Sequence, residues 1–179
     1  WNTVETKTLH KQSTNFPLNL FFTYKFNLLL DTTKTLTREE RALRSNVLAI
    51  IRMSPNYTVK FLDNINCLLE ISHLPYPLNY GVANQFMLAK RGMIKADICR
   101  GAILYNYGGW YLDVDVGMIR SLRSLENNIV GSYGFVSVIP AYEPSEAIFQ
   151  AIVGCTKQNS VLLRYLQGFV HSKIQDTLE

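Results

Sequence analysis

The chain has 179 residues, of which 47% are hydrophobic and 18% are charged. This length suffices for one hydrophobic core, and the composition excludes an intrinsically disordered chain. The formal net charge is +4, but the 18 Lys and Arg residues are scattered along the chain. Because a nucleic-acid-binding surface gathers its basic residues into a patch, we expect no nucleic-acid partner. A mild positive field suits a phosphate-bearing substrate equally well.

The polar residues 1–15 lack periodicity and predict a linker or arm, followed by a single domain over residues 16–179. The polar run at Glu179 is compatible with truncation at the C-terminus. The apolar stretch 16–30 is too short and too interrupted by polar residues to span a bilayer. Because the chain begins with Trp1 rather than Met, we expect membrane contact only through a segment absent from this sequence.

Three cysteines, Cys67, Cys99 and Cys155, form an odd set without a close pair. A disulfide framework or a zinc ribbon needs paired cysteines at short spacing. We therefore expect neither, and we interpret the three residues as small buried apolar side chains.

The first elements follow a strand, helix, strand order. Residues 18–24 are dense in apolar and aromatic side chains and predict a buried strand. Thr37, with Glu40 three residues later, is typical of a helix start, and apolar residues at helical spacing continue to Ile51. Residues 57–62 alternate and predict a second strand. This order is how a parallel α/β sheet is built.

The later elements are less regular. Residues 67–71 fit a short helix and residues 75–77 a loop. Residues 92–107 have an apolar face at helical spacing and end at two glycines, which predicts a helix. Residues 110–119 and 129–139 predict strands, and residues 145–153 and 159–171 predict helices.

Asp113 and Asp115 stand two residues apart in an apolar stretch, so in a strand both carboxylates project from the same side. Like charges in that position repel unless a cation lies between them or the strand ends at solvent. A divalent metal bound by hard oxygen ligands and substrate phosphates is the natural compensation. An isolated Asp-x-Asp is also an ordinary solvated strand end. The preceding Gly108-Gly109, which permits a tight turn, favours a crevice instead.

Asp97 and Arg100 are three residues apart on the predicted helix 92–107 and therefore neighbours on one face. Two interpretations stay open. The pair is either a surface ion pair, which contributes about 0.3 kcal/mol, or a carboxylate that accepts from sugar hydroxyls beside a guanidinium that donates to hydroxyl or phosphate.

The 22 residues from Lys95 to Val116 read Lys-Ala-Asp-Ile-Cys-Arg-Gly-Ala-Ile-Leu-Tyr-Asn-Tyr-Gly-Gly-Trp-Tyr-Leu-Asp-Val-Asp-Val. This stretch resembles the signature of glycosyltransferases with a DXD sugar-binding region. That family includes initiating α-1,6-mannosyltransferases, α-1,4-galactosyltransferases and capsular polysaccharide glycosyltransferases, and the glucosylating toxins share the pattern. Further segments at 23–25, 54–63 and 146–154 are similar in order, so the resemblance covers residues 18–170.

The resemblance implies an α/β fold of the GT-A type, a Rossmann-like sandwich with a mainly parallel central sheet. Its implied activity is metal-dependent, retaining transfer of a hexose from a UDP- or GDP-sugar to a glycan, glycolipid or protein acceptor. The implied location is the Golgi lumen, as a type II membrane enzyme, if the source is eukaryotic, and the cytoplasm if it is bacterial or viral.

The resemblance also implies roles for individual residues. Asp115 is expected to bind Mn²⁺ or Mg²⁺, and Asp113 to share the metal while it holds ribose or sugar hydroxyls. Asp97 and Arg100 are expected to orient the donor sugar. Further substrate contacts are expected from Thr23, Tyr24, Asp63, Gly109 and Tyr111.

The chain departs from the family pattern at two places. Phe21-Phe22 stands where His-Gln is common, and Gln150 stands where Asn is usual. These positions bear on base recognition and acceptor contacts. Two alternatives therefore stay open: a degenerate sugar- or nucleotide-binding module, and a metal-dependent phosphoryl-transfer enzyme that uses the same acids.

Overall fold

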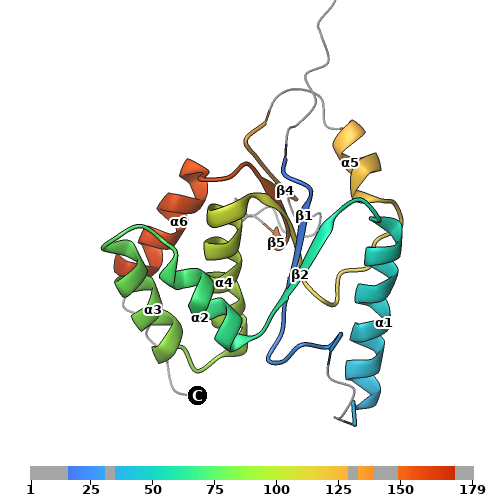
Figure 1. Cartoon of the computed structure of the whole chain (residues 1–179), viewed down its shortest axis with the longest axis horizontal. Coiled ribbons are helices and arrows are strands. Elements are labelled where there is room, and N and C mark those ends of the chain that lie inside the picture. Colours follow the sequence, from blue (N-terminus) through green and yellow to red (C-terminus); the bar gives the residue numbers. More distant parts are fainter. Residues whose placement is uncertain (1–15, 31–34, 129–132, 139–148, 172–179) are drawn as a thin grey trace, which may run out of the picture.

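The computed structural model describes residues 16–30, 35–128, 133–138 and 149–171, so the predicted arm at 1–15 lies outside it. A five-stranded sheet of order β2-β1-β3-β5-β4 forms the centre (Figure 1). The first three of these strands are mutually parallel, and β5 runs antiparallel to both of its neighbours. The strands are β1 (Asn19–Thr23), β2 (Thr58–Leu62), β3 (Gly109–Leu112), β4 (Phe135–Val138) and β5 (Phe149–Cys155). The predicted α/β class with a mainly parallel centre is confirmed.

Helices cover both faces of this sheet. On one face lie α1 (Arg38–Met53) and α5 (Leu122–Asn128), and on the other α2 (Asn64–Ser72), α3 (Leu78–Leu88), α4 (Gly92–Tyr107) and α6 (Ser160–His171) (Figure 1). Successive strand side chains point to opposite faces, which divides the core in two. Phe21 and Tyr111 belong to the core on the α4 side, and Phe22 and Trp110 to the core on the α1 side.

Local sequence signals account for the regular parts. The Thr37 hydroxyl accepts from the Glu40 amide at 3.2 Å, and the Glu40 carboxylate accepts from the Thr37 amide at 3.0 Å, so the predicted start of α1 is a capping box. The helices predicted at 92–107 and 159–171 are confirmed as α4 and α6. No helix within the described ranges is long and apolar enough to cross a membrane.

Three predicted elements need correction. The strand predicted over 110–119 ends at Leu112, because the Val116 amide donates to the Asp113 carbonyl at 3.1 Å and turns the chain. The helix predicted over 145–153 is wrong for residues 149–153, which form β5 between β3 and β4, while residues 145–148 lie outside the described ranges. Within the predicted strand 129–139, β4 occupies 135–138, and residues 129–132 and 139 are likewise not described.

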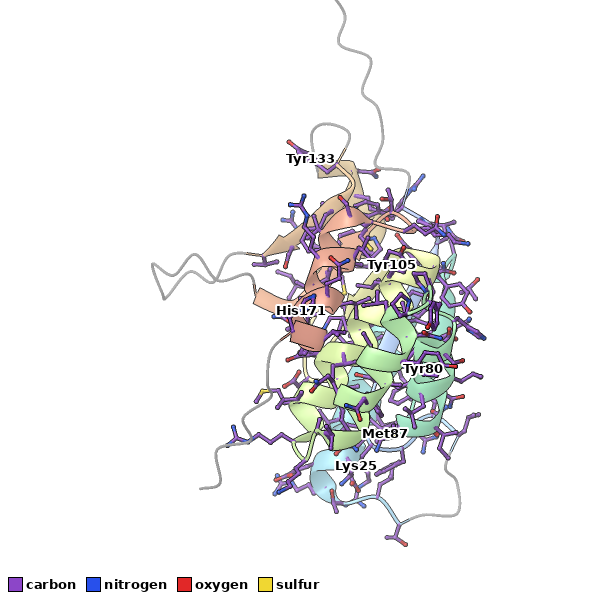
Figure 2. The ribbon with its side chains drawn as sticks, turned by 90° about the vertical axis from the view of Figure 1, so that its left-hand side faces the viewer. Lys25, Tyr80, Met87, Tyr105, Tyr133 and His171 are labelled. Carbon is purple, nitrogen blue, oxygen red and sulfur yellow. A yellow bond between two sulfur atoms is a disulfide. The ribbon has the colours of Figure 1, made fainter. Side chains whose placement is uncertain are left out.

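Two features of the α4 side were not predicted. Helix α3 follows the predicted loop 75–77 and was not predicted, and its Tyr80 and Met87 side chains point into solvent (Figure 2). A disulfide joins Cys67 of α2 to Cys99 of α4, which corrects the expectation of three free cysteines. These residues are far apart in sequence, and only the packing of α2 on α4 brings them together. Cys155 is free and buried, as predicted.

Candidate active site

A cleft of about 780 Å³ lies at the carboxyl ends of β1 and β3 and beside the first turns of α2 and α4. Open α/β sheets bind ligands at this edge. Most of the residues singled out from the sequence line it together, although they come from distant parts of the chain: Thr23, Tyr24, Asp97, Arg100, Tyr111, Asp113 and Asp115.

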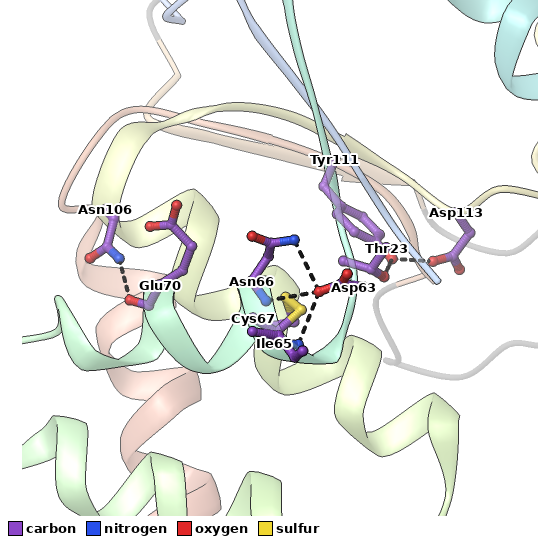
Figure 3. The surroundings of a disulfide bond; sticks show 10 residues. Thr23, Asp63, Ile65, Asn66, Cys67, Glu70, Asn106, Tyr111 and Asp113 are labelled. Carbon is purple, nitrogen blue, oxygen red and sulfur yellow. Dashed lines mark hydrogen bonds between the residues drawn. A yellow bond between two sulfur atoms is a disulfide. The ribbon is translucent and has the colours of Figure 1, made fainter. Parts of the chain in front are cut away.

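A buried hydrogen-bond chain leads to the first acid of the pair. The Tyr111 hydroxyl donates to Asp113 Oδ1 at 2.7 Å and lies 2.8 Å from Thr23 Oγ1 (Figure 3). A phenol has one hydrogen, so the Thr23 hydroxyl must be the donor to Tyr111. Burial raises the pKa of Tyr111, and the phenol therefore stays protonated. These two hydrogen bonds orient the Asp113 carboxylate from beneath the cleft.

The backbone around the two acids is held by neighbouring elements. The Asp113 amide donates to the Ala151 carbonyl at 2.9 Å, and Asn46 Nδ2 of α1 donates to the carbonyls of Val114 at 2.8 Å and Val116 at 2.7 Å. Asp113 is half-buried and Asp115 is exposed. The acids thus lie on a braced turn after β3, and the expectation that both project from one side of a strand is wrong.

Asn46 was not predicted from the sequence. Its signal is a polar side chain between Leu43 and Val47, within the apolar stripe of α1. An amide at such a position needs partners for its hydrogens, and the turn supplies two carbonyls.

In the Asp97–Arg100 pair the guanidinium is buried and the carboxylate is half-buried, so this is not an exposed surface pair. Arg100 is 5% exposed. Its guanidinium donates to Asp97 Oδ1 and to the Gln150 carbonyl, and lies 4.6 Å from the centroid of the Tyr111 ring. Burial raises the pKa of Asp97, the Arg100 charge opposes that rise, and the Asp113 charge adds to it. The carboxylates of Asp97 and Asp113 therefore share one electrostatic environment in the cleft.

A second unpredicted residue holds this region from α6. The Tyr165 hydroxyl donates to Gln150 Oε1 at 2.9 Å and lies 3.3 Å from the Asp97 carbonyl oxygen. Gln150, which departs from the family pattern, lines the cleft with its side chain held by this contact. No sequence signal marks Tyr165, because only the packing of α6 on α4 brings it there.

Two predicted substrate contacts are not among the residues that line the cleft. Asp63 Oδ1 accepts from the Ile65 and Asn66 amides at 3.0 and 2.9 Å and caps α2 (Figure 3). Gly109 lies at the opposite end of β3, at φ 111°, where a Cβ would stand 2.6 Å from the Asn19 carbonyl oxygen. Both residues have a structural reason for their identity.

The carboxylates of the cleft suit a metal that is shared with a substrate. The described residues contain no group of three or more His, Cys, Asp or Glu that could hold a metal. Mg²⁺ and similar hard cations are usually bound by one or two carboxylates together with substrate phosphates and waters. Asp113 and Asp115 supply that partial set of oxygen ligands, so the residues fit the implied metal.

Residues 45–136 match the family model described as glycosyltransferase sugar-binding region containing DXD motif, and the match spans more than half of the chain and both acids. The chain belongs to this glycosyltransferase family. Membership accounts for an Asp-x-Asp turn at the edge of the cleft.

The glycosyltransferase is also similar to a solved structure, the PaToxG glycosyltransferase. The TM-score is 0.58 at 14% sequence identity, over 87% of this chain and 59% of that chain. This likeness shows the fold, and it confirms the predicted GT-A type α/β sandwich. The chain thus spans 59% of the length of that structure. No curated protein matches the sequence.

Proposed function

We propose that this glycosyltransferase moves a hexose from a UDP- or GDP-sugar to a glycan, glycolipid or protein acceptor, with retention at the anomeric carbon. The observation that carries the proposal is the braced turn of Asp113 and Asp115 at the carboxyl edge of the parallel strands. The cleft volume of about 780 Å³ falls in the range of small-molecule sites.

The proposed activity requires Mn²⁺ or Mg²⁺. Asp115, which is exposed, would hold the ion, and Asp113 would share it while accepting from a sugar or ribose hydroxyl. A bound divalent ion acts as a Lewis acid that neutralises charge on a departing diphosphate. The protein's contribution is to hold the backbone of the turn through Asn46 and the Ala151 carbonyl, and the Asp113 carboxylate through Tyr111.

The other residues have distinct proposed roles. Asp97 accepts from a donor-sugar hydroxyl, and Arg100, whose guanidinium is already bound to Asp97 and the Gln150 carbonyl, positions it. Thr23 and Tyr111 act through Asp113, and Tyr24 offers an aromatic face near the base. Substrate contacts by Asp63 and Gly109 stay predictions.

Domain extent and location complete the proposal. We take residues 16–179 as one catalytic domain. The Cys67–Cys99 disulfide supports an oxidising compartment over the cytoplasm, because disulfides persist where thiols are not kept reduced.

The test is calorimetric titration of the chain with UDP- and GDP-sugars, with and without Mn²⁺, followed by a donor hydrolysis assay. We expect one donor class to bind in a Mn²⁺-dependent manner. Asp115→Asn should abolish turnover, while Glu39→Gln, a matched change at an exposed acid on α1, should not. A folded Asp115→Asn variant with undiminished turnover would refute the proposal, and Mn²⁺-dependent binding without any turnover would indicate the degenerate binding module.

A further inference from the structure

The mouth of the cleft has an exposed apolar border. Ile65 lies in the first turn of α2, Met87 and Leu88 in the last turn of α3, and Met93 in the first turn of α4. Their exposed fractions are 79%, 63%, 59% and 67%. These helix ends gather at the same end of the molecule as the carboxyl end of β1 (Figure 1). Met93 and Asn64, the neighbour of Ile65, line the cleft itself.

This border continues as an apolar surface along α3. Tyr80 and Met87 lie on one face of the helix (Figure 2), and the ring of Tyr80 contacts that of Tyr76 at 5.8 Å between centroids. Among the described residues, seven of the thirteen exposed large hydrophobic side chains fall between positions 65 and 93. Monomeric proteins seldom expose apolar side chains so densely unless the surface binds something.

The charge of the border is positive. Lys90 and Arg91 are exposed on the connection between α3 and α4. Between positions 64 and 96 the sole acidic residue is Glu70, which is buried and bound to His73. Exposed apolar side chains next to basic ones are the chemistry of an interfacial surface that meets anionic lipid. We name this surface the mouth rim: Ile65, Met87, Leu88, Lys90, Arg91 and Met93.

We propose that the mouth rim docks on a membrane surface that contains anionic lipid. Its apolar side chains enter the headgroup region, and Lys90 and Arg91 contact lipid phosphates. Because the cleft opens beside the rim, docking brings the cleft to the membrane surface, where a lipid-borne acceptor is within reach. The binding itself needs neither donor nor metal, so it is independent of the proposed transferase activity.

The experiment is sedimentation of the full chain with vesicles of phosphatidylcholine alone, and of phosphatidylcholine with phosphatidylserine in equal amounts. We expect binding to the mixed vesicles that weakens with salt. Met87→Ser/Leu88→Ser should lower the affinity by about tenfold or more, and Arg91→Gln by about fivefold. The matched controls are Ile119→Ser, at a side chain that is 95% exposed, and Arg164→Gln on α6, and both should bind normally.

Three results would overturn the proposal: no binding to the mixed vesicles, equal binding to both vesicle types, or a Met87→Ser/Leu88→Ser variant that binds as well as wild type. A wild-type dimer in analytical ultracentrifugation that this double variant converts to a monomer would show instead that a second copy covers the rim. Donor hydrolysis should be unchanged in the double variant. A chain that binds vesicles but no donor would refute only the proposed function.

Discussion

The two faces of β3 show how the same kind of contact serves two purposes. On one face the indole of Trp110 donates to Glu126 at 2.8 Å, and Tyr57 and Arg123 complete the set at 2.8 and 3.3 Å. On the other face Tyr111 donates to Asp113, which is half-buried at the cleft. Glu126 is 7% exposed and satisfied by protein donors. A carboxylate surrounded by donors stabilises the fold, whereas one fixed by a single donor at a cleft keeps acceptor capacity for a ligand.

The largest effect is expected from the cleft side. Asp113→Asn keeps the acceptor for Tyr111 but removes the charge, so donor turnover should fall by about 10²–10³-fold, as for loss of one electrostatic contact in a transition state. The free energy of unfolding should change by less than about 1 kcal/mol. Steady-state kinetics and urea unfolding measure both, and a loss of stability without a loss of turnover would contradict the contrast between the faces.

The opposite pattern is expected from Glu126→Ala. It leaves the buried hydroxyl of Tyr57 and the indole of Trp110 without their acceptor, which should lower the free energy of unfolding by about 3 kcal/mol. Turnover of the folded enzyme below its transition temperature should be nearly normal. Glu126→Gln, which keeps an acceptor, is the matched control and should lose less. An Ala variant as stable as wild type would show that the cluster is not structural.

A smaller and more specific effect is expected from Tyr111→Phe. Removal of one hydroxyl frees Asp113 to rotate, so turnover should fall about tenfold, mainly in kcat. Tyr57→Phe makes the same chemical change on the other face and should lower stability instead of turnover. If both variants affected stability alone, the hydrogen bond from Tyr111 to Asp113 would have no part in catalysis.

The smallest effect is expected from Thr23→Val. This substitution preserves the side-chain shape and removes the hydroxyl that donates to Tyr111. Turnover should fall by about twofold to fivefold, because the change acts only through the phenol. In the Tyr111→Phe background the same substitution should have no further effect. A double-mutant cycle measures this, and additive losses would mean that Thr23 contacts the substrate directly.

The parallel half of the sheet was predictable from the sequence because its signals are local. The capping box of Thr37 and Glu40 and the alternation in β2 need no tertiary information. The antiparallel half was not, because the apolar run 149–155 fits a buried strand and a helix equally well. Its strand state comes from pairing with β3 and β4, which no local pattern reports.

The candidate site shows the same division. Spacing and family resemblance pointed to Asp97, Arg100 and the Asp113–Asp115 pair, which the fold brings into one cleft. The burial of Arg100 and the brace from Asn46 depend on the packing of α4 and α1 against the strands, so they emerged only in three dimensions. The role of Gly109 was predictable in part, since a glycine pair signals a turn but not which end of the strand binds a ligand.

The disulfide has a practical consequence for anyone who prepares this enzyme. Cys67 lines the cleft and Cys99 precedes Arg100, so reduction of this disulfide would remove a tie between α2 and α4 at one wall of the site. The remaining cysteine needs no such protection, because burial raises the pKa of the Cys155 thiol to about 12 and keeps it in its unreactive form. Purification without dithiothreitol therefore keeps the disulfide at this wall of the cleft, and the free thiol needs no reductant.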